Sequence, residues 1–90
     1  MSDSPPPYRV EVVPAARRHA AKLPSSIRQR IEIALEGLSV DPRPAGARAL
    51  VGSDALRLRI GDYRAVYRVD DTARVVEVLR VAHRREVYRR

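Results

Sequence analysis

The side chains best suited to chemistry are arginines that alternate with apolar residues. Arg57 and Arg59 take every second position in the apolar run 56–60, and Arg64 and Arg68 follow on the next β-prone segment. Because strand side chains alternate between faces, the apolar set turns to the core and Arg57 and Arg59 turn away from it. With matching parity on the return strand, four guanidiniums gather on one face. They indicate a polyanionic ligand; an ordinary solvated sheet face is the alternative.

A second group of polar residues lies near the C-terminus. His83, Arg84, Arg85 and Tyr88 provide a titratable imidazole, two guanidiniums and a phenol, which can bind a phosphate and stack on a base. The alternatives are a strand-end His83 bonded to backbone and a Tyr88 that pins the tail to the core. His19 lies among basic residues of a predicted helix and is interpreted as a surface residue.

Several other chemistries are disfavoured by the residue inventory. The chain has no cysteine, which excludes disulfides, a Cys-ligated zinc site and a thiol nucleophile. Its four glycines are scattered rather than gathered in a phosphate-binding loop. No His or carboxylate pair has zinc-ligand spacing. Asp70 and Asp71 are interpreted as turn residues, so we expect neither a metal nor a cofactor.

Length and charge narrow the class of protein further. Ninety residues fit one small domain, and 44% apolar residues are typical of a globular chain. The net charge is +7, and the second half holds eleven arginines against six acidic residues. A nucleic acid or an acidic protein segment is the expected partner, although arginine-rich genomic composition is an alternative. With no long apolar run and no secretory signal, we expect a cytoplasmic protein without membrane contact.

The first half is predicted to contain a strand and a helical hairpin. Residues 1–7 are proline-rich and predicted to be a disordered tail, and residues 8–13 alternate as a strand does. A first helix follows, and Pro24 breaks the chain after Leu23. A second helix carries an apolar stripe that ends before the prolines at 42 and 44; its members are Ile27, Ile31, Leu35 and Leu38.

The second half changes to the period of strands. Strands are predicted at 56–60, 63–69 and 74–82, joined by turns at Gly61-Asp62 and at 70–73. The last strand is apolar at both parities, which indicates a central position. The expected fold is therefore α+β: an N-terminal strand, a helical hairpin and a three-stranded antiparallel meander in one sheet, with helices on one face. Residues 8–90 form the single predicted domain.

These motifs together resemble the RelE/ParE superfamily of bacterial type II toxin–antitoxin toxins, most closely its RelE-like branch. The resemblance rests on LRLRIGDYRAVYRVDD at 56–71 and VLRVAHRREVY at 78–88, with Leu23-Pro24, Asp41-Pro42, and Leu50 with Gly52. It covers about residues 8 to 89. The combination of hairpin and tail is fairly specific, whereas each piece alone is a weak signal. The fold that the resemblance implies is the same α+β arrangement.

The resemblance implies a metal-independent endoribonuclease that cuts mRNA in the ribosomal A site. In this family the ribose 2′-hydroxyl attacks the adjacent phosphate, expels the 5′-oxygen and leaves a 2′,3′-cyclic phosphate. By position, Arg57 and Arg59 contact RNA and assist the attack, Arg64 holds the scissile phosphate, Arg84 assists the leaving group and Tyr88 stacks on a base. The expected catalytic set is Arg57, Arg59, Arg64, Arg84 and His83; the expected RNA-binding set is Arg57, Arg59, Arg68, Arg85 and Tyr88.

The chain departs from the family pattern at two places. Arg57 and Arg59 stand where some members have lysines, and arginine is a poor base because its pKa exceeds about 12. His83 is then the nearby group that titrates near neutrality, which makes it a candidate acid or base. Val51 stands where some active members have a basic residue.

The family also implies a partner and two competing functions. The partner is an acidic or amphipathic antitoxin of the RelB or Phd type, through which any contact with DNA would be made. One competing function is a ParE-like inhibitor of DNA gyrase, which has the same fold and cuts nothing. The other is a catalytically weak module that only binds an antitoxin.

Overall fold

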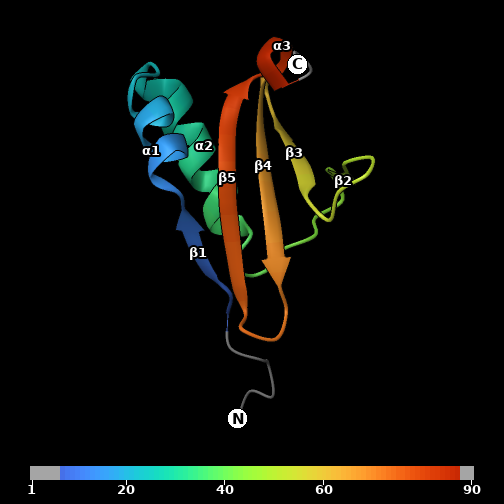
Figure 1. Ribbon diagram of the computed structural model, residues 1–90. Helices are drawn as coiled ribbons and strands as arrows, with labels where there is room; N and C mark the ends of the chain where they lie inside the picture. Colours follow the sequence, from blue (N-terminus) through green and yellow to red (C-terminus); the bar gives the residue numbers. More distant parts are fainter. Residues whose placement is uncertain (1–6, 88–90) are drawn as a thin grey trace.

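The computed structural model describes residues 7–87, and these form one sheet with two helices beside it (Figure 1). The elements in chain order are β1 (Arg9–Val12), α1 (Pro14–Ala21), α2 (Ser25–Gly37), β2 (Ala47–Ala49), β3 (Leu56–Ile60), β4 (Tyr63–Asp70), β5 (Val75–His83) and α3 (Arg84–Val87). The sheet order is β1-β5-β4-β3-β2. Strand β1 runs parallel to β5, and the other neighbours are antiparallel.

The α+β prediction is confirmed, and its predicted strands end within one residue of the observed ones. The helical hairpin and the β3-β4-β5 meander are both present. Two short elements were not predicted: β2, which adds a fifth strand beside β3, and α3, which lies in the expected polar tail. Of the predicted disordered tail, residues 1–6 lie outside the described part of the chain.

The core forms between α2 and one face of the sheet. Ile31, Leu35 and Leu38 of the predicted helical stripe are buried, and Ile27 packs at the margin. On the sheet side the largest buried side chain is Tyr67, which is fully buried and donates a hydrogen bond from its hydroxyl to the Pro42 carbonyl at 2.7 Å. Each fully buried aliphatic or aromatic side chain contributes about 1.5–3 kcal/mol, so this face determines which side of each strand turns inward.

The break between the two helices falls at the predicted proline. Pro24 has φ −54° and ψ 149°, an extended conformation that ends α1 and precedes α2. Arg28, in the first turns of α2, donates hydrogen bonds to the carbonyls of Ala21 at 3.4 Å and Leu23 at 3.1 Å. These bonds satisfy carbonyl groups that the end of α1 leaves without a helical partner.

A β-bulge part-way along β5 changes which alternate positions of the strand face the core. Val66 pairs with Arg80, whereas the next residue, Tyr67, pairs with Val78, so Leu79 is the extra residue. Before the bulge Val78 faces the core, and after it Val81 does. The bulge therefore explains why the sequence of β5 is apolar at both parities, and it turns Arg80 to the face away from the helices.

Asp71 joins three separate segments at the end of the sheet where β4 turns into β5. Arg43 binds its carboxylate through two nitrogens, at 3.1 and 2.9 Å, and the Tyr8 hydroxyl donates to the same carboxylate. The Arg74 guanidinium lies 4.2 Å from the centre of the Tyr8 ring. The hydrogen bonds from Arg43 and Tyr8 lower the pKa of Asp71 from 3.8 to about 2. Asp71 is thus more than a turn residue, because it holds the loop before β2 against the start of β1.

Stability should therefore fall as Asp71 is protonated. A carboxyl group whose pKa is lower in the folded chain stabilises the fold above its unfolded pKa, and this contribution disappears as pH falls from about 4 to about 2. We expect Asp71→Asn to lower the melting temperature at pH 6 and to remove part of the loss between pH 4 and 2, measured by circular dichroism. Asp54→Asn is the control. Equal acid profiles for wild type and Asp71→Asn would contradict this interpretation.

Candidate functional site

A cleft lined by arginines opens on the outer face of the sheet, the face that α2 does not cover. Its volume is about 410 Å³, and its lining residues are Gly46, Arg48, Arg57, Arg59 and Arg64. Among the described residues, no carboxylate lines this cleft. Such a concentration of guanidiniums is suited to binding a phosphate group, because each presents planar N–H donors to its oxygens.

Strand register brings these arginines together. Arg59 of β3 is directly opposite Arg64 of β4, and Arg57 is directly opposite Arg48 of β2. Residues paired across antiparallel strands project from the same face, with Cβ atoms about 4.5–5.5 Å apart. The prediction that Arg57, Arg59 and Arg64 share one face is therefore confirmed by the register.

Arg64 lies deepest in the cleft. It is 8% exposed and is the buried charged residue among those described. Its Nη1 donates hydrogen bonds to the carbonyls of Tyr63 at 3.1 Å and Gly61 at 3.4 Å. These acceptors orient the guanidinium but carry no full negative charge to neutralise it. A buried cation in this state is stabilised by an anionic ligand, and the open cleft provides the space for one.

The tight turn between β3 and β4 supports both Arg64 and the start of α3. Gly61 has φ +61°, a positive value as expected for the first central position of the predicted two-residue turn, and its carbonyl accepts a hydrogen bond from Arg64. The carbonyl of Asp62 accepts the backbone N–H of Arg84 at 2.7 Å. Arg84 is exposed and begins α3, so the turn places it near the same end of the sheet as Arg64.

Two arginines of the outer face were missed by sequence reasoning. Arg48 lines the cleft from β2, a three-residue strand too short to show a period; its Nη1 donates to the Ala45 and Ala47 carbonyls at 3.3 and 3.4 Å. Arg80 is opposite Val66, which in turn is opposite Arg57, so it shares the outer face. It could have been found only by anticipating the bulge at Leu79.

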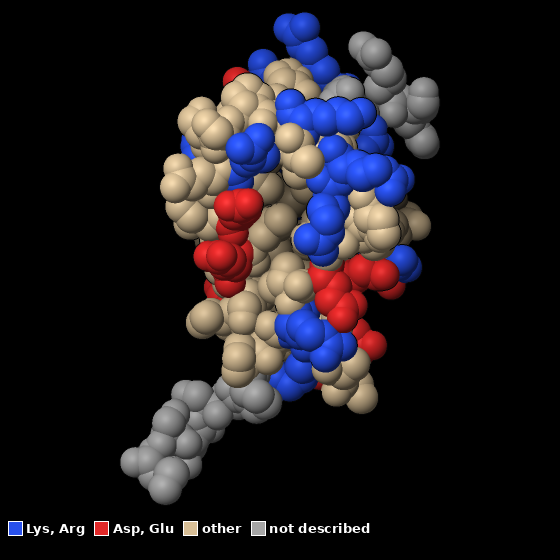
Figure 2. All heavy atoms as spheres, turned by 90° about the vertical axis from the view of Figure 1, so that its left-hand side faces the viewer, with Lys and Arg blue, Asp and Glu red and all other residues tan. Residues whose placement is uncertain are grey.

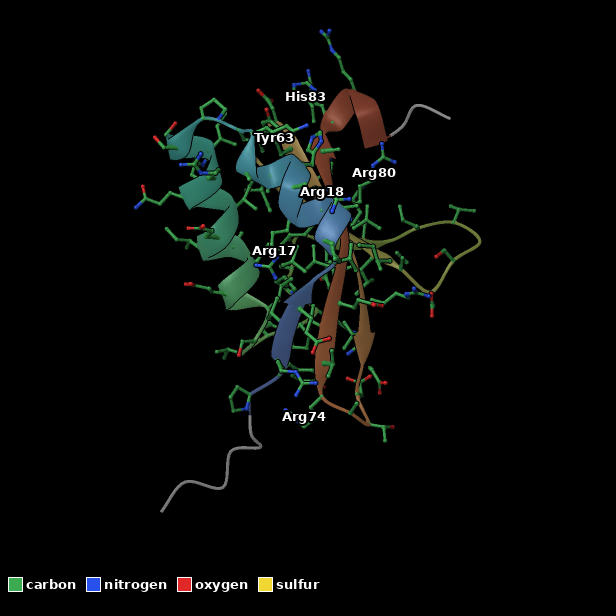
Figure 3. The ribbon with its side chains drawn as sticks, turned by 60° about the vertical axis from the view of Figure 1, so that its left-hand side comes forward. Arg17, Arg18, Tyr63, Arg74, Arg80 and His83 are labelled. Carbon is green, nitrogen blue, oxygen red and sulfur yellow. The ribbon has the colours of Figure 1, made fainter. Side chains whose placement is uncertain are left out.

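His83 and Arg68, two predicted site residues, do not line the cleft. His83 is paired with Tyr63, and the two rings meet edge to face with centroids 5.4 Å apart (Figure 3). Since Tyr63 and Arg64 are adjacent on one strand, His83 projects from the opposite face to Arg64. Its Nδ1 accepts the Arg85 backbone N–H at 3.3 Å, as expected for a strand-end histidine bonded to backbone. Arg85 itself is exposed on α3.

Arg68 belongs to the other half of the outer face, which is acidic. It lies 3.6 Å from Glu77, and Glu11 of β1 is paired with Glu77 in the register. A hollow of about 580 Å³ here is also lined by Asp54 and Asp70. On the right-hand side of Figure 2, basic side chains gather above such an acidic group. Arg68 therefore shares the outer face, as predicted, but the prediction that it lies close to the other three arginines is wrong, because it is four residues further along β4 and beside carboxylates.

Tyr88 lies outside the described residues. Within residues 7–87, no three His, Asp or Glu side chains are grouped as a metal site would require. No helix in the described part of the chain is long and apolar enough to cross a membrane.

Comparison with known proteins identifies the family. The model of the ParE toxin of the type II toxin–antitoxin system, parDE, matches residues 10–88. Toxin RelG of Mycobacterium tuberculosis is 41% identical over 88 residues, which cover 93% of this chain and 99% of that protein. Toxin RelE of the same organism is 34% identical, covering 99% of this chain and 93% of the relative.

Solved structures agree with these matches. The toxin–antitoxin complex RelBE2 from M. tuberculosis aligns with a TM-score of 0.75 and 36% identity, covering 86% of this chain and 98% of the matched chain. The intact E. coli RelBE complex aligns with a TM-score of 0.73 and 28% identity, covering 84% and 95%. Fold and matches define a toxin of a type II toxin–antitoxin system. The chain belongs to the RelE/ParE family, in its RelE-like branch.

The opposed arginines should make the cleft a source of instability. Like charges directly opposite each other on a sheet cost about 0.2–1 kcal/mol, and 1 kcal/mol shifts the melting temperature of a domain this size by roughly 4–8 °C. We expect Arg59→Gln to raise the melting temperature by about 2–4 °C at low salt, with little gain at about 1 M salt, where charges are screened. Arg68→Gln is the matched control, since Arg68 has a carboxylate beside it. A gain that persists at high salt would show that repulsion is not the cause.

Proposed function

We propose that this toxin is a metal-independent endoribonuclease that cuts mRNA in the ribosomal A site. The observation that carries the proposal is the buried Arg64 guanidinium in a cleft lined by three further arginines. A phosphodiester matches this cleft in charge and in hydrogen-bonding capacity. Family membership adds that a ribosome-bound message is the expected source of that phosphodiester.

The proposed reaction is an in-line attack within the RNA. The ribose 2′-hydroxyl loses its proton to water as its oxygen forms a bond to the adjacent phosphorus. The bond from phosphorus to the 5′-oxygen breaks, this oxygen takes up a proton from water, and a 2′,3′-cyclic phosphate remains. Negative charge increases on the phosphate oxygens during the attack, and fixed guanidiniums stabilise it without rearranging. Arg64 holds the phosphate, while Arg57 and Arg59 contact the attacking side.

The leaving oxygen and the neighbouring base are assigned to the C-terminal segment. Arg84 starts α3 next to the β3–β4 turn, a position from which its guanidinium can assist the departing 5′-oxygen. Arg85 contributes a further positive charge for RNA, and Tyr88 is proposed to stack on a base, as the family resemblance implies. Arg48, which lines the cleft from β2, joins the proposed RNA-binding set.

In this proposal, proton transfer by a protein side chain is not the main cause of the acceleration of RNA cleavage. The side chains that line the cleft are all arginines, which do not titrate in the neutral range. His83 projects from the other face, beside Tyr63. Charge stabilisation and alignment on the ribosome therefore supply most of the acceleration.

The proposed partner is an antitoxin of the RelB type. Structures that match this fold include toxin–antitoxin complexes of RelE with RelB from E. coli and Pyrococcus horikoshii. A chain with net charge +7 is complementary to an acidic or amphipathic segment that covers the same arginines. Contact with DNA would then be made through the antitoxin.

Gyrase inhibition is the second candidate, because the matching family model is that of the ParE toxin. This function requires no phosphodiester in the cleft. The two candidates therefore differ in what the loss of Arg64 should do to messenger RNA.

Cleavage should depend on the charge and shape of Arg64. On ribosomes programmed with a defined message, we expect Arg64→Ala to slow cleavage by about 100-fold or more, as for the loss of one transition-state donor. Arg64→Lys should retain part of the rate, because lysine keeps the positive charge but cannot make the bidentate hydrogen bonds of arginine. Arg9→Ala, an exposed arginine that is paired with Glu11, is the control. Intact messages with wild-type protein and altered DNA supercoiling in cells would support gyrase inhibition, and no toxicity would support a binding module.

The pH dependence of cleavage should reveal the role of His83. Since His83 lies on the opposite face from Arg64, we expect His83→Gln to reduce the rate less than tenfold and to leave the shape of the pH profile unchanged between about pH 5.5 and 8. Single-turnover rates on programmed ribosomes measure this. An inflection in the wild-type pH profile that is absent from the variant would instead assign proton transfer to His83.

A further inference from the structure

A second hollow adjoins the arginine cleft, between β5 and α1. Its volume is about 400 Å³, and its lining residues are Ala15, Ala16, His19, Leu79, Arg80, Val81 and Ala82. The hollow exists because β1 ends at Val12, which is paired with Val78, and α1 then takes the place beside β5. Neither the proposed cleavage chemistry nor the predicted site residues account for it.

Strand register places the hollow next to the cleft. Ala82 is directly opposite Arg64, and Arg80 is opposite Val66, which is itself opposite Arg57. Only the small side chain of Ala82 therefore stands between Arg64 and the hollow on that pair of strands. Neighbouring strands lie about 4.8 Å apart, which places the hollow within roughly 10 Å of the phosphate that Arg64 is proposed to bind.

The lining of the hollow combines an apolar floor with a cation. Its accessible apolar side chains are those of Ala15, which is exposed, and Leu79, which is half-buried, whereas Ala16 and Ala82 are only 3% and 2% exposed. Arg80 is exposed at the edge, and His19 lies on the helix side. Figure 3 shows Arg80 and Arg18 near the same end of β5. Apolar side chains beside a guanidinium suit a nucleotide, whose base can contact the apolar side chains and whose phosphate can bind the arginine.

The charges of the outer face leave few other routes for RNA. In the lower half of the face, Glu11 and Glu77 are paired across β1 and β5, and Arg68 is beside Glu77. Phosphates are repelled by these carboxylates. A chain that passes through the cleft is therefore directed across the strands towards α1 rather than along them towards the β4–β5 turn.

We propose that the hollow between β5 and α1 is a second nucleotide subsite, which holds a nucleotide flanking the scissile phosphate. The base contacts Ala15 and Leu79, and the backbone phosphate contacts Arg80. This inference rests on the proposed ribonuclease function. It assigns Arg80 and Ala15 a part in substrate positioning that none of the predicted site residues has.

The test uses the full chain and programmed ribosomes that carry messages with one abasic nucleotide, placed on either side of the cut in separate messages. For wild type we expect the abasic nucleotide on one side to slow cleavage about fivefold, through loss of the apolar contact.

Ala15→Leu, which fills the hollow from an exposed position, should slow cleavage of the normal message similarly. Cleavage by this variant should not be slowed further by that abasic nucleotide. Arg80→Ala should raise about tenfold the concentration of programmed ribosomes at which the cleavage rate is half-maximal. The controls are Ala21→Leu on the same helix and Arg9→Ala.

The outcomes separate the subsite from the function on which it rests. Cleavage by wild type without coupling between Ala15→Leu and either abasic position would overturn the subsite alone. No cleavage by wild type would overturn the ribonuclease function and the subsite together. Normal cleavage by Ala15→Leu and Arg80→Ala, with weaker neutralisation by the antitoxin, would assign the hollow to a protein partner instead and overturn the proposal.

Discussion

Strand alternation across the β3–β4 hairpin is the constraint on which the rest of the site depends. Leu58, Ile60 and Tyr67 pack under α2, and burying each side chain contributes about 1.5–3 kcal/mol. Arg59 and Arg64, at the intervening positions, must then oppose each other on the outer face, although their repulsion costs about 0.2–1 kcal/mol. Packing is the larger effect, so the core holds the guanidiniums together in the absence of an anion.

The parts of the fold that were predictable depend on local patterns. The helical stripe, the proline break and the two-residue turn at Gly61 each follow from a few adjacent residues, and so does the shared face of Arg57 and Arg59. Arg48 and Arg80 could not be predicted, because β2 is recognisable only when paired with β3 and the bulge at Leu79 depends on the partner strand. Because of that bulge, Glu77 and Arg80 share one face although they are three residues apart.

The bulge separates two electrostatic environments on one sheet face. On one side arginines from four strands share the face, and on the other Arg68 lies among the carboxylates of Glu11 and Glu77. A polyanion is attracted to the first half and repelled by the second, so under the proposed function the face would direct RNA as well as bind it. An acidic antitoxin segment would be attracted to the same half and would then compete with RNA for it.

A crystal structure of the chain with a short RNA that carries a 2′-O-methyl group at the cut position would test the central claim most directly. The methyl group blocks the attacking oxygen, so the scissile phosphate remains in place. The account predicts that this phosphate accepts hydrogen bonds from the buried guanidinium of Arg64, with Arg57 and Arg59 on its attacking side. A phosphate bound elsewhere on the molecule, with the arginine cleft empty, would contradict it.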